Sequence, residues 1–359
     1  MFTRAQTRRI RVGKVPIGGG APVAIQSMTI TETRDVEATV QQIRDLHVAG
    51  ADIVRVAVPR DEDALALPAI CRDAPCPVIA DIHFDFRLAM LALEADLGGL
   101  RLNPGNIGGE ERVKKVAHKA RDKGIPIRIG VNAGSLEKGL REVLHGDVPQ
   151  AMVVSASRHI GMLEAVDFHD IKVSLKSSDV RTTIEAYRVF AERYDYPLHL
   201  GVTEAGTLVQ GAVRSAAGIG TLLADGLGDT IRVSLATDPV QEVAVAKHLL
   251  KAFGLRAGGM TLVACPSCGR AQVDVFAMAE RVEKRLRAVK ADITVAVMGC
   301  AVNGPGEARD ADVGLAGGND AFLLFRKGEI VKKFPPADAE DRLVEEALRI
   351  AAEMGRLPT

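Results

Sequence analysis

Ile171-Lys172-Val173-Ser174-Leu175-Lys176 is the stretch of sequence that decides the fold, because apolar and polar residues alternate along it. Alternation with a period of two predicts a β-strand whose two faces meet different surroundings. Similar short runs recur along the chain, and we expect strands at 24–28, 53–58, 78–82, 100–103, 127–131, 171–175, 198–203 and 231–235. Helical patterns separate several of these runs, at 36–49, 110–123, 181–193, 209–224 and 239–253.

This succession of strands and helices predicts a (β/α)8 TIM barrel of the α/β class, because neighbouring parallel strands need a crossover helix between them. A doubly wound open sheet alternates in the same way and is the structural alternative. Eight units, with no Gly-x-Gly-x-x-Gly motif after the first strand, favour the barrel.

The regular alternation of strands and helices ends at Gly259. A strand that ends in Cys265 comes next, and a helical pattern covers 273–289. Short strands follow between 293 and 334, and a last helix covers 338–354. We therefore expect a barrel domain at 1–256 and a small α+β domain at 257–359.

Composition excludes several classes of protein. The 46 basic and 46 acidic residues balance, so no global charge favours a nucleic acid, and Trp is absent. No apolar run approaches the roughly 20 residues that span a bilayer. Five cysteines, an odd number, favour a reducing compartment, and we expect a cytoplasmic protein. The basic start of the chain could be a transit peptide, but residues 10–15 alternate like a strand.

One face of the expected barrel strands is polar. Because the intervening residues are apolar, these side chains should point into the barrel near the carboxyl ends of the strands, where barrel enzymes build their active sites. The expected substrate-binding residues are Arg55, Arg101, Asn103, Arg128, Asn132, Lys172, Ser174, Lys176, Arg232 and Ser234.

The cations of this face, two lysines and four arginines, would repel one another in one cavity unless an anion filled it. A diphosphate is the ligand that suits this cavity, because the planar guanidinium of Arg can donate two hydrogen bonds to phosphate oxygens and Lys adds a mobile positive charge. The alternative is that each cation pairs with a neighbouring acid such as Asp81 or Asp52.

Two residues at the same rim suit proton transfer. Glu204 ends a strand beside glycines that let a substrate approach, although an exposed loop carboxylate would look the same. His83 follows Asp81 on one strand face, where Asp81 can orient the imidazole. A core histidine with a satisfied hydrogen bond is the alternative for His83.

The second domain carries a metal pattern. Cys265 and Cys268 form a C-x2-C motif, and Cys300 follows after 31 further residues. No histidine occurs after His248, which weakens a Cys3His zinc site, whereas Glu307 offers a carboxylate in a Gly/Pro loop. Three thiolates and one exchangeable oxygen ligand favour an iron–sulfur cluster.

Other residues near this pattern are less specific. Asn303 lies in the same loop as Glu307 and either polarises the surroundings of the cluster or forms the turn. Cys71 and Cys76 flank the start of the third strand, at the amino end of the barrel, so we interpret them as packing residues.

The chain resembles the bacterial 4-hydroxy-3-methylbut-2-en-1-yl diphosphate synthase family of the methylerythritol phosphate route to isoprenoids. The resemblance covers essentially the whole chain. Its most specific motifs are Ile25-Gln26-Ser27-Met28-Thr29, Arg101-Leu102-Asn103-Pro104-Gly105-Asn106, Gly201-Val202-Thr203-Glu204-Ala205-Gly206, Cys265-Pro266-Ser267-Cys268-Gly269-Arg270 and Met298-Gly299-Cys300-Ala301-Val302-Asn303-Gly304-Pro305-Gly306-Glu307.

The resemblance implies an oxidoreductase with a [4Fe-4S] cluster held by Cys265, Cys268, Cys300 and Glu307. It implies reductive opening of 2-C-methyl-D-erythritol 2,4-cyclodiphosphate with loss of water, with flavodoxin or ferredoxin as electron donor. By the same match, the diphosphate would be held by Arg55, Arg101, Arg128, Asn132, Lys176, Arg232 and Ser234, and Glu204 would act in acid/base chemistry.

Topology adds an expectation about assembly. The last barrel helix returns to the amino-terminal face, so the short link near Gly258 starts away from the expected cavity. We therefore expect a head-to-tail homodimer with shared active sites, as the family also implies.

Two alternatives belong to other enzyme classes. A barrel lyase or aldolase with a structural zinc domain would use Lys172 or Lys176 as a Schiff-base former. A pterin-binding barrel methyltransferase would have a similar sequence pattern.

Overall fold

The computed structural model describes residues 2–300, 304–318 and 321–354, and the chain divides into two compact units, Met1–Arg256 and Ala257–Thr359. Within the described part of the first unit, one sheet holds eight strands in the order β8-β7-β6-β5-β4-β3-β10-β9. All of its paired strands are parallel. The strands are β3 (Ala24–Met28), β4 (Ile53–Ala57), β5 (Val78–Asp81), β6 (Gly99–Arg101), β7 (Ile127–Asn132), β8 (Ile171–Lys176), β9 (His199–Leu200) and β10 (Thr230–Ile231).

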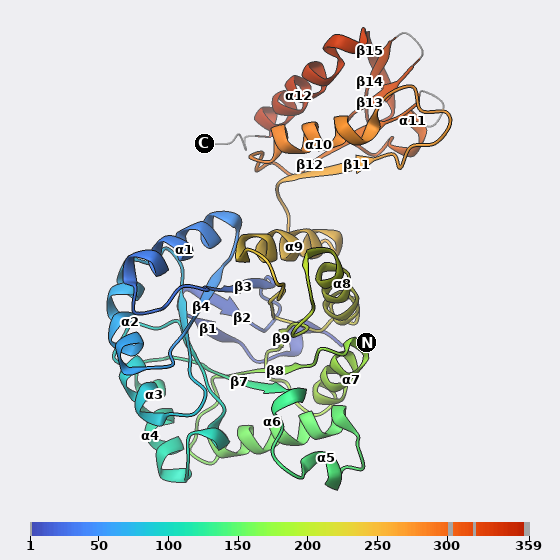
Figure 1. Ribbon diagram of the computed structural model, residues 1–359. Coiled ribbons are helices and arrows are strands. Elements are labelled where there is room, and N and C mark those ends of the chain that lie inside the picture. Colours follow the sequence, from blue (N-terminus) through green and yellow to red (C-terminus); the bar gives the residue numbers. More distant parts are fainter. Residues whose placement is uncertain (1, 301–303, 319–320, 355–359) are drawn as a thin grey trace. The chain divides into compact units, whose positions relative to one another are not determined.

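The two ends of this sheet meet, which closes it into a barrel. Val173 of β8 forms a parallel bridge with Leu198, and its N–H donates to the carbonyl oxygen of Pro197 at 2.9 Å. Figure 1 shows these strands at the centre of the first unit with helices around them. The prediction of a TIM barrel is therefore confirmed, and the doubly wound open sheet is wrong.

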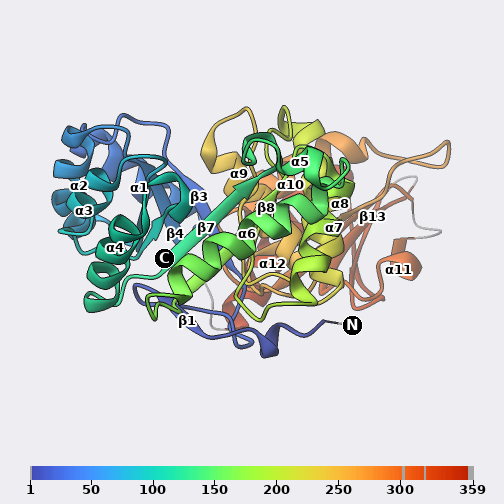
Figure 2. The same cartoon turned by 90° about the horizontal axis from the view of Figure 1, so that it is seen from below.

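Five of the helices around the barrel begin where an aspartate caps them. The carboxylates of Asp35, Asp85, Asp147, Asp179 and Asp238 each accept a backbone N–H from the first turn of the following helix. The helices are α1 (Val36–Ala49), α2 (Asp61–Asp73), α3 (Phe86–Ala92), α4 (Glu110–Asp122), α5 (Leu140–Val143), α6 (Val148–Glu164), α7 (Val180–Ala191), α8 (Leu208–Ala224) and α9 (Pro239–Ala252). In Figure 2, α6 runs beside β7 and β8, against which it packs.

A hairpin closes the amino end of the barrel. The predicted strand at 10–15 is the hairpin of β1 (Ile10–Val12) and β2 (Val15–Ile17), turned by Gly13 with φ of 54°. Its Ile10, Val12 and Ile17 pack against Ala24, Ile53 and Ile79 from the barrel strands. The bottom of the barrel is therefore apolar, and polar residues occupy its interior only above this layer.

The second unit is an α+β layer structure. In its described part, the sheet order is β11-β12-β13-β14-β15, with the first three strands parallel and the last two antiparallel. One buried cluster joins the two long helices to the sheet, and a second cluster lies among Ala296, Met298, Ala308, Ala311, Ala316 and Phe325. The elements are β11 (Met260–Ala264), α10 (Val275–Leu286), β12 (Ile293–Met298), α11 (Gly304–Glu307), β13 (Val313–Gly317), β14 (Phe322–Arg326), β15 (Glu329–Phe334) and α12 (Pro336–Glu353). None of the helices in the described ranges is long and apolar enough to cross a membrane.

Candidate active site in the barrel and cysteine pocket in the second unit

A row of charged residues crosses the inner face of the barrel. Strand register places Asp81 beside Arg101, Arg101 beside Arg128, and Arg128 beside Lys172. Neighbours in register point to the same face of a parallel sheet. All four side chains are buried. The structure therefore brings the predicted inward residues of four adjacent strands together.

Asp81 is the acid at the centre of this row. Its carboxylate lies 3.2 Å from Arg101 Nη1 and 3.5 Å from Arg55 Nε. Burial opposes ionisation, but Arg55, His83, Arg101 and Arg128 outweigh it and hold the Asp81 pKa well below its ordinary value. Asp81 is therefore ionised and anchors two of the arginines.

His83 lies at the mouth rather than in the core. Its side chain is 53% exposed, Nε2 lies 3.5 Å from Asp81 Oδ1, and Arg101 Nη1 approaches the same nitrogen at 2.8 Å. The alternative of a core histidine is wrong because a core side chain would be covered. Asp81 and Arg101 hold this imidazole where a ligand can reach it.

The other cations have few acidic partners. Arg232 Nη2 lies 3.6 Å from Glu242, Arg128 Nη1 donates to Ser174 Oγ at 2.6 Å, and Lys176 Nζ lies 3.2 Å from His199 Nε2. Asp52, which we considered as a partner, instead binds Arg256 at 2.8 Å. Among the described residues, several buried nitrogens find no hydrogen-bond partner, namely Arg101 Nε, Arg128 Nε and Nη2, Lys172 Nζ and Arg232 Nε.

Burial and this excess of positive charge lower the pKa of the cations themselves. Burial, followed by neighbouring arginines, holds the pKa of Arg128 and Lys176 well below the ordinary values. The same causes lower the pKa of Lys172 to about 7 and of Arg232 to about 10. An anion in the barrel would offset this electrostatic cost.

Three of the predicted binding residues lie deep in the barrel or bind neighbouring strands. Asn103 Nδ2 donates to the Gly130 carbonyl at 2.9 Å, and its Oδ1 accepts the Gly130 N–H at 2.8 Å. Ser174 is 1% exposed and accepts from Arg128. Lys172 is the second residue of β8, deeper than Lys176, and is 2% exposed. Asn103 and Ser174 therefore hold neighbouring groups and Lys172 lies beneath Lys176, while direct contact of these three residues with a substrate stays a prediction.

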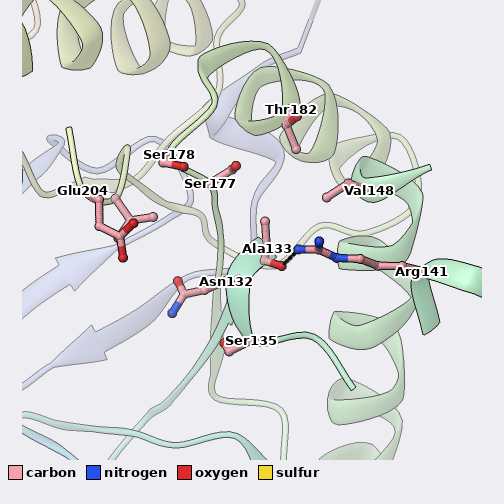
Figure 3. A pocket seen from close by; sticks show the side chains of 11 residues that line it. Asn132, Ala133, Ser135, Arg141, Val148, Ser177, Ser178, Thr182 and Glu204 are labelled. Atoms are coloured by element: carbon pink, nitrogen blue, oxygen red, sulfur yellow. Dashed lines mark hydrogen bonds between the residues drawn. The ribbon is translucent and has the colours of Figure 1, made fainter. Parts of the chain in front are cut away.

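A pocket of about 480 Å³ opens at the carboxyl ends of the strands. Figure 3 shows Asn132 and Glu204 on the same side of it. Glu204 is exposed and has φ of 53°, a left-handed conformation that costs energy for a residue with a side chain. Such strain is typical of functional positions. Ser234, another predicted binding residue, is half-buried three residues after β10.

Sequence reasoning missed part of this pocket. Ser177, Ser178 and Thr203 line it, as does Arg141, which donates to the carbonyl oxygen of Ala133. Ser177 and Ser178 follow β8 directly, so their place at a strand end was a usable signal. Arg141 comes from the short helix α5, and no periodicity in the sequence pointed to it.

The second unit has a pocket of about 170 Å³ that gathers the predicted metal ligands. Cys265, Cys268, Cys300 and Glu307 line it, whereas Asn303 lies outside the described residues. As they stand, no three His, Cys, Asp or Glu side chains of the described chain are close enough to hold a metal ion. The donor chemistry fits an iron–sulfur cluster, because three thiols and a carboxylate share one pocket.

A backbone contact supports the same fit. Ser267 has φ of 66°, and its N–H points at Cys265 Sγ over 3.4 Å. Amide N–H groups directed at cysteine sulfur stabilise thiolate and tune iron–sulfur clusters. By contrast, Cys76 belongs to the barrel core and Cys71 packs against it. Burial raises the pKa of both these thiols to about 12, as expected for packing residues.

Comparisons with known proteins agree over nearly the whole chain. The family profile of the GcpE TIM-barrel domain matches residues 7–247, and that of the GcpE protein C-terminal domain matches residues 261–349. A 4-hydroxy-3-methylbut-2-en-1-yl diphosphate synthase (flavodoxin) from Geobacter sulfurreducens is 57% identical, covering 98% of this chain and 99% of the relative. The enzyme of the same name from Clostridium perfringens is 53% identical, covering 97% and 99%.

Among solved structures, dihydropteroate synthase from Stenotrophomonas maltophilia superposes with a TM-score of 0.50 at 14% identity. The match covers 69% of this chain and 97% of that one. At this identity the likeness shows a shared fold alone.

Proposed function

The chain belongs to the GcpE family, and on that premise we propose that it is an iron–sulfur oxidoreductase that opens 2-C-methyl-D-erythritol 2,4-cyclodiphosphate reductively. Two electrons and one proton enter, the ring C–O bond to phosphate breaks and leaves an ionised phosphate oxygen, a hydroxyl takes the proton and leaves as water, and (E)-4-hydroxy-3-methylbut-2-enyl diphosphate results. The observation that carries this proposal is the excess of buried cations in the barrel beneath a pocket that holds Glu204.

The cations hold the diphosphate of the substrate. Burial and neighbouring cations lower the pKa of Arg128, Lys176 and Arg232, because little negative charge surrounds them. Phosphate oxygens supply that negative charge and accept hydrogen bonds from these side chains. Asp81 keeps Arg55 and Arg101 in place for the same task. Asn132 and Ser234 donate neutral hydrogen bonds at the mouth, and Lys172 adds positive charge from below.

Glu204 is the residue proposed to move a proton at the hydroxyl that leaves as water. It is exposed in the pocket and fixed by a strained turn between Thr203 and Gly206. His83, held by Asp81 and Arg101, is the second group placed for proton transfer at the mouth.

Cys265, Cys268, Cys300 and Glu307 are the residues proposed to hold a [4Fe-4S] cluster, with Asn303 in the same loop. When bound, such a cluster supplies low-potential electrons and an iron whose carboxylate ligand can be exchanged. The names of the relatives make flavodoxin the proposed electron donor, with ferredoxin as the alternative carrier. The lyase or aldolase alternative with structural zinc is not favoured by these names.

The place where the first unit ends supports shared active sites. Arg256, its last residue, binds Asp52 directly before β4 and the Gly50 carbonyl. Both contacts lie at the amino-terminal face of the barrel, opposite Glu204. We therefore propose that the second unit completes the barrel site of a partner in a head-to-tail homodimer.

The first test is the iron, zinc and acid-labile sulfide content of protein purified without oxygen. We expect about four irons and four sulfides per chain. Cys300→Ser should lower both, whereas Cys71→Ser, a control in the barrel, should leave them unchanged. Stoichiometric zinc without sulfide would contradict the proposal. Turnover of the cyclodiphosphate with reduced flavodoxin then tests the reaction itself.

A further inference from the structure

A fully buried histidine lies beneath the proposed diphosphate site. His199, the first residue of β9, is 0% exposed. Its Nε2 lies 3.2 Å from Lys176 Nζ, and its Nδ1 lies 2.8 Å from Thr230 Oγ1. The imidazole therefore links a lysine of β8 to a threonine of β10 across the short strand between them.

The surroundings fix the protonation of this imidazole. Burial, followed by Lys176, Arg128, Lys172 and Arg55, holds the His199 pKa well below its ordinary value, so the ring is neutral. When a bound diphosphate keeps Lys176 charged, its ammonium has only donors, so Nε2 accepts from Lys176. The single ring proton then lies on Nδ1 and is donated to Thr230 Oγ1.

A glycine leaves room for the end of the same lysine side chain. A Cβ at Gly201 would lie 2.7 Å from Lys176 Nζ, 3.0 Å from its Cε and 2.8 Å from the Arg232 carbonyl oxygen. No side chain fits there without moving the ammonium or the backbone of the next strand. Positions 199 and 201, two residues apart on one strand face, therefore contact the end of the same side chain.

We propose that His199 and Gly201 form a cradle that positions Lys176 for the diphosphate, His199 as a positioning residue and Gly201 as the space that the ammonium needs. A lysine side chain has many rotamers, and binding is stronger when the protein has ordered it beforehand. One N–H of the ammonium donates to His199, and the other two remain available to phosphate oxygens. This inference rests on the proposed function, since it takes Lys176 as a substrate ligand.

The test compares two replacements of His199. His199→Leu removes the acceptor, and we expect KM for the cyclodiphosphate to rise about tenfold while kcat changes less than about threefold. His199→Gln places an amide oxygen near the position of Nε2, and it should restore KM to within about threefold of the wild type. Gly201→Ala should raise KM as His199→Leu does. Equal KM values for the Leu variant and the wild type would overturn the cradle.

A double-mutant cycle separates this inference from the proposed function. Lys176→Met should raise KM, and His199→Leu should then add no further rise. If Lys176→Met leaves KM unchanged, the proposed role of Lys176 fails. If Lys176→Met raises KM and the effect of His199→Leu adds to it in full, the ligand role stands and the cradle is wrong.

Tyr187→Phe is the matched control for folding. The Tyr187 hydroxyl donates to the backbone carbonyl of His199, so its loss disturbs the same residue without touching the imidazole. We expect unchanged KM. Should His199→Leu fail to fold, Thr230→Val removes the partner of Nδ1 instead, and it should raise KM by about threefold. An unchanged KM in Thr230→Val would count against the cradle.

Discussion

At the scale of single residues, Glu204 combines exposure with a strained backbone. Its left-handed φ of 53° would suit glycine, yet a carboxylate occupies the position and lines the pocket. A left-handed conformation costs a residue with a Cβ about 1–2 kcal/mol. The fold therefore gives up stability to place this carboxylate at the mouth of the barrel.

Replacing Glu204 should separate stability from activity. We expect Glu204→Gln to lower kcat by about 100-fold or more, because general acid/base groups contribute at least that much. Its melting temperature should stay unchanged. Glu204→Gly should be equally inactive but as stable as the wild type, or more stable by up to about 1 kcal/mol, since glycine relieves the strain. Substantial turnover in Glu204→Gln would remove Glu204 from the chemistry.

Lys172 should make stability depend on pH. Its pKa is lowered from 10.5 to about 7, first by burial and then by Arg128. At pH values below about 7 the folded protein bears the full cost of a buried ammonium, and this cost fades as pH rises toward 10.5. Lys172→Met should therefore be more stable by about 1–4 kcal/mol at pH 6, with a difference that shrinks toward pH 10.

Denaturant unfolding of Lys172→Met at several pH values measures this difference. Lys115→Met, at an exposed position of α4, is the control and should change stability by less than about 0.5 kcal/mol throughout. A difference in the free energy of unfolding between Lys172→Met and the wild type that widens as pH rises would contradict this prediction.

At the scale of elements, glycines on the barrel strands make room for cations. A Cβ at Gly130 of β7 would lie 2.7 Å from Arg101 Nε. Asn103 binds both backbone groups of Gly130, so this strand cannot move aside freely. Gly130 and Asn103 together therefore decide where Arg101 lies, just as Gly201 does for Lys176.

Gly130→Ala should push Arg101 away from Asp81. We expect a loss of about 1–3 kcal/mol in stability, as for other insertions into packed interiors, together with a higher KM for the substrate. Gly161→Ala is the matched control, because nothing lies within 4 Å of its added Cβ and it sits inside α6. The control should stabilise the protein by about 0.5–1 kcal/mol. A Gly130→Ala variant with wild-type stability and KM would contradict the steric argument.

At the scale of the whole molecule, two units carry two halves of the proposed chemistry. The barrel holds the cations and Glu204, and the second unit holds the cysteine pocket. If the sites are shared between subunits, a dimer of one Glu204→Gln chain and one Cys300→Ser chain keeps one intact site. Mixing the two inactive variants should restore up to about a quarter of wild-type activity, because half of the dimers are mixed and each has one site.

Activity after subunit exchange measures this complementation, and each variant alone provides the background. A mixture that stays at background, although native mass spectrometry shows mixed dimers, would mean that both halves of a site come from one chain.

Several features of this protein were determined by the sequence alone. Apolar and polar residues alternate along 171–176 and along the other predicted strands, and this pattern predicted the barrel. A side-chain period of two gives each strand one face toward the helices and one toward the interior. The same alternation brought Asp81, Arg101 and Arg128 to one face. The spacing of Cys265, Cys268 and Cys300 marked the pocket that they line.

Only the tertiary structure decided which of these residues face the pocket and which support others. Depth in the barrel depends on strand tilt and register, so Lys172 lies beneath Lys176 although both alternate on β8. Hydrogen bonds between segments far apart in sequence join Asn103 to Gly130 and His199 to Lys176. Arg141 and the left-handed turn at Glu204 depend on loop paths that no period encodes. Periodicity is local, whereas loops and register are set by packing against the whole barrel.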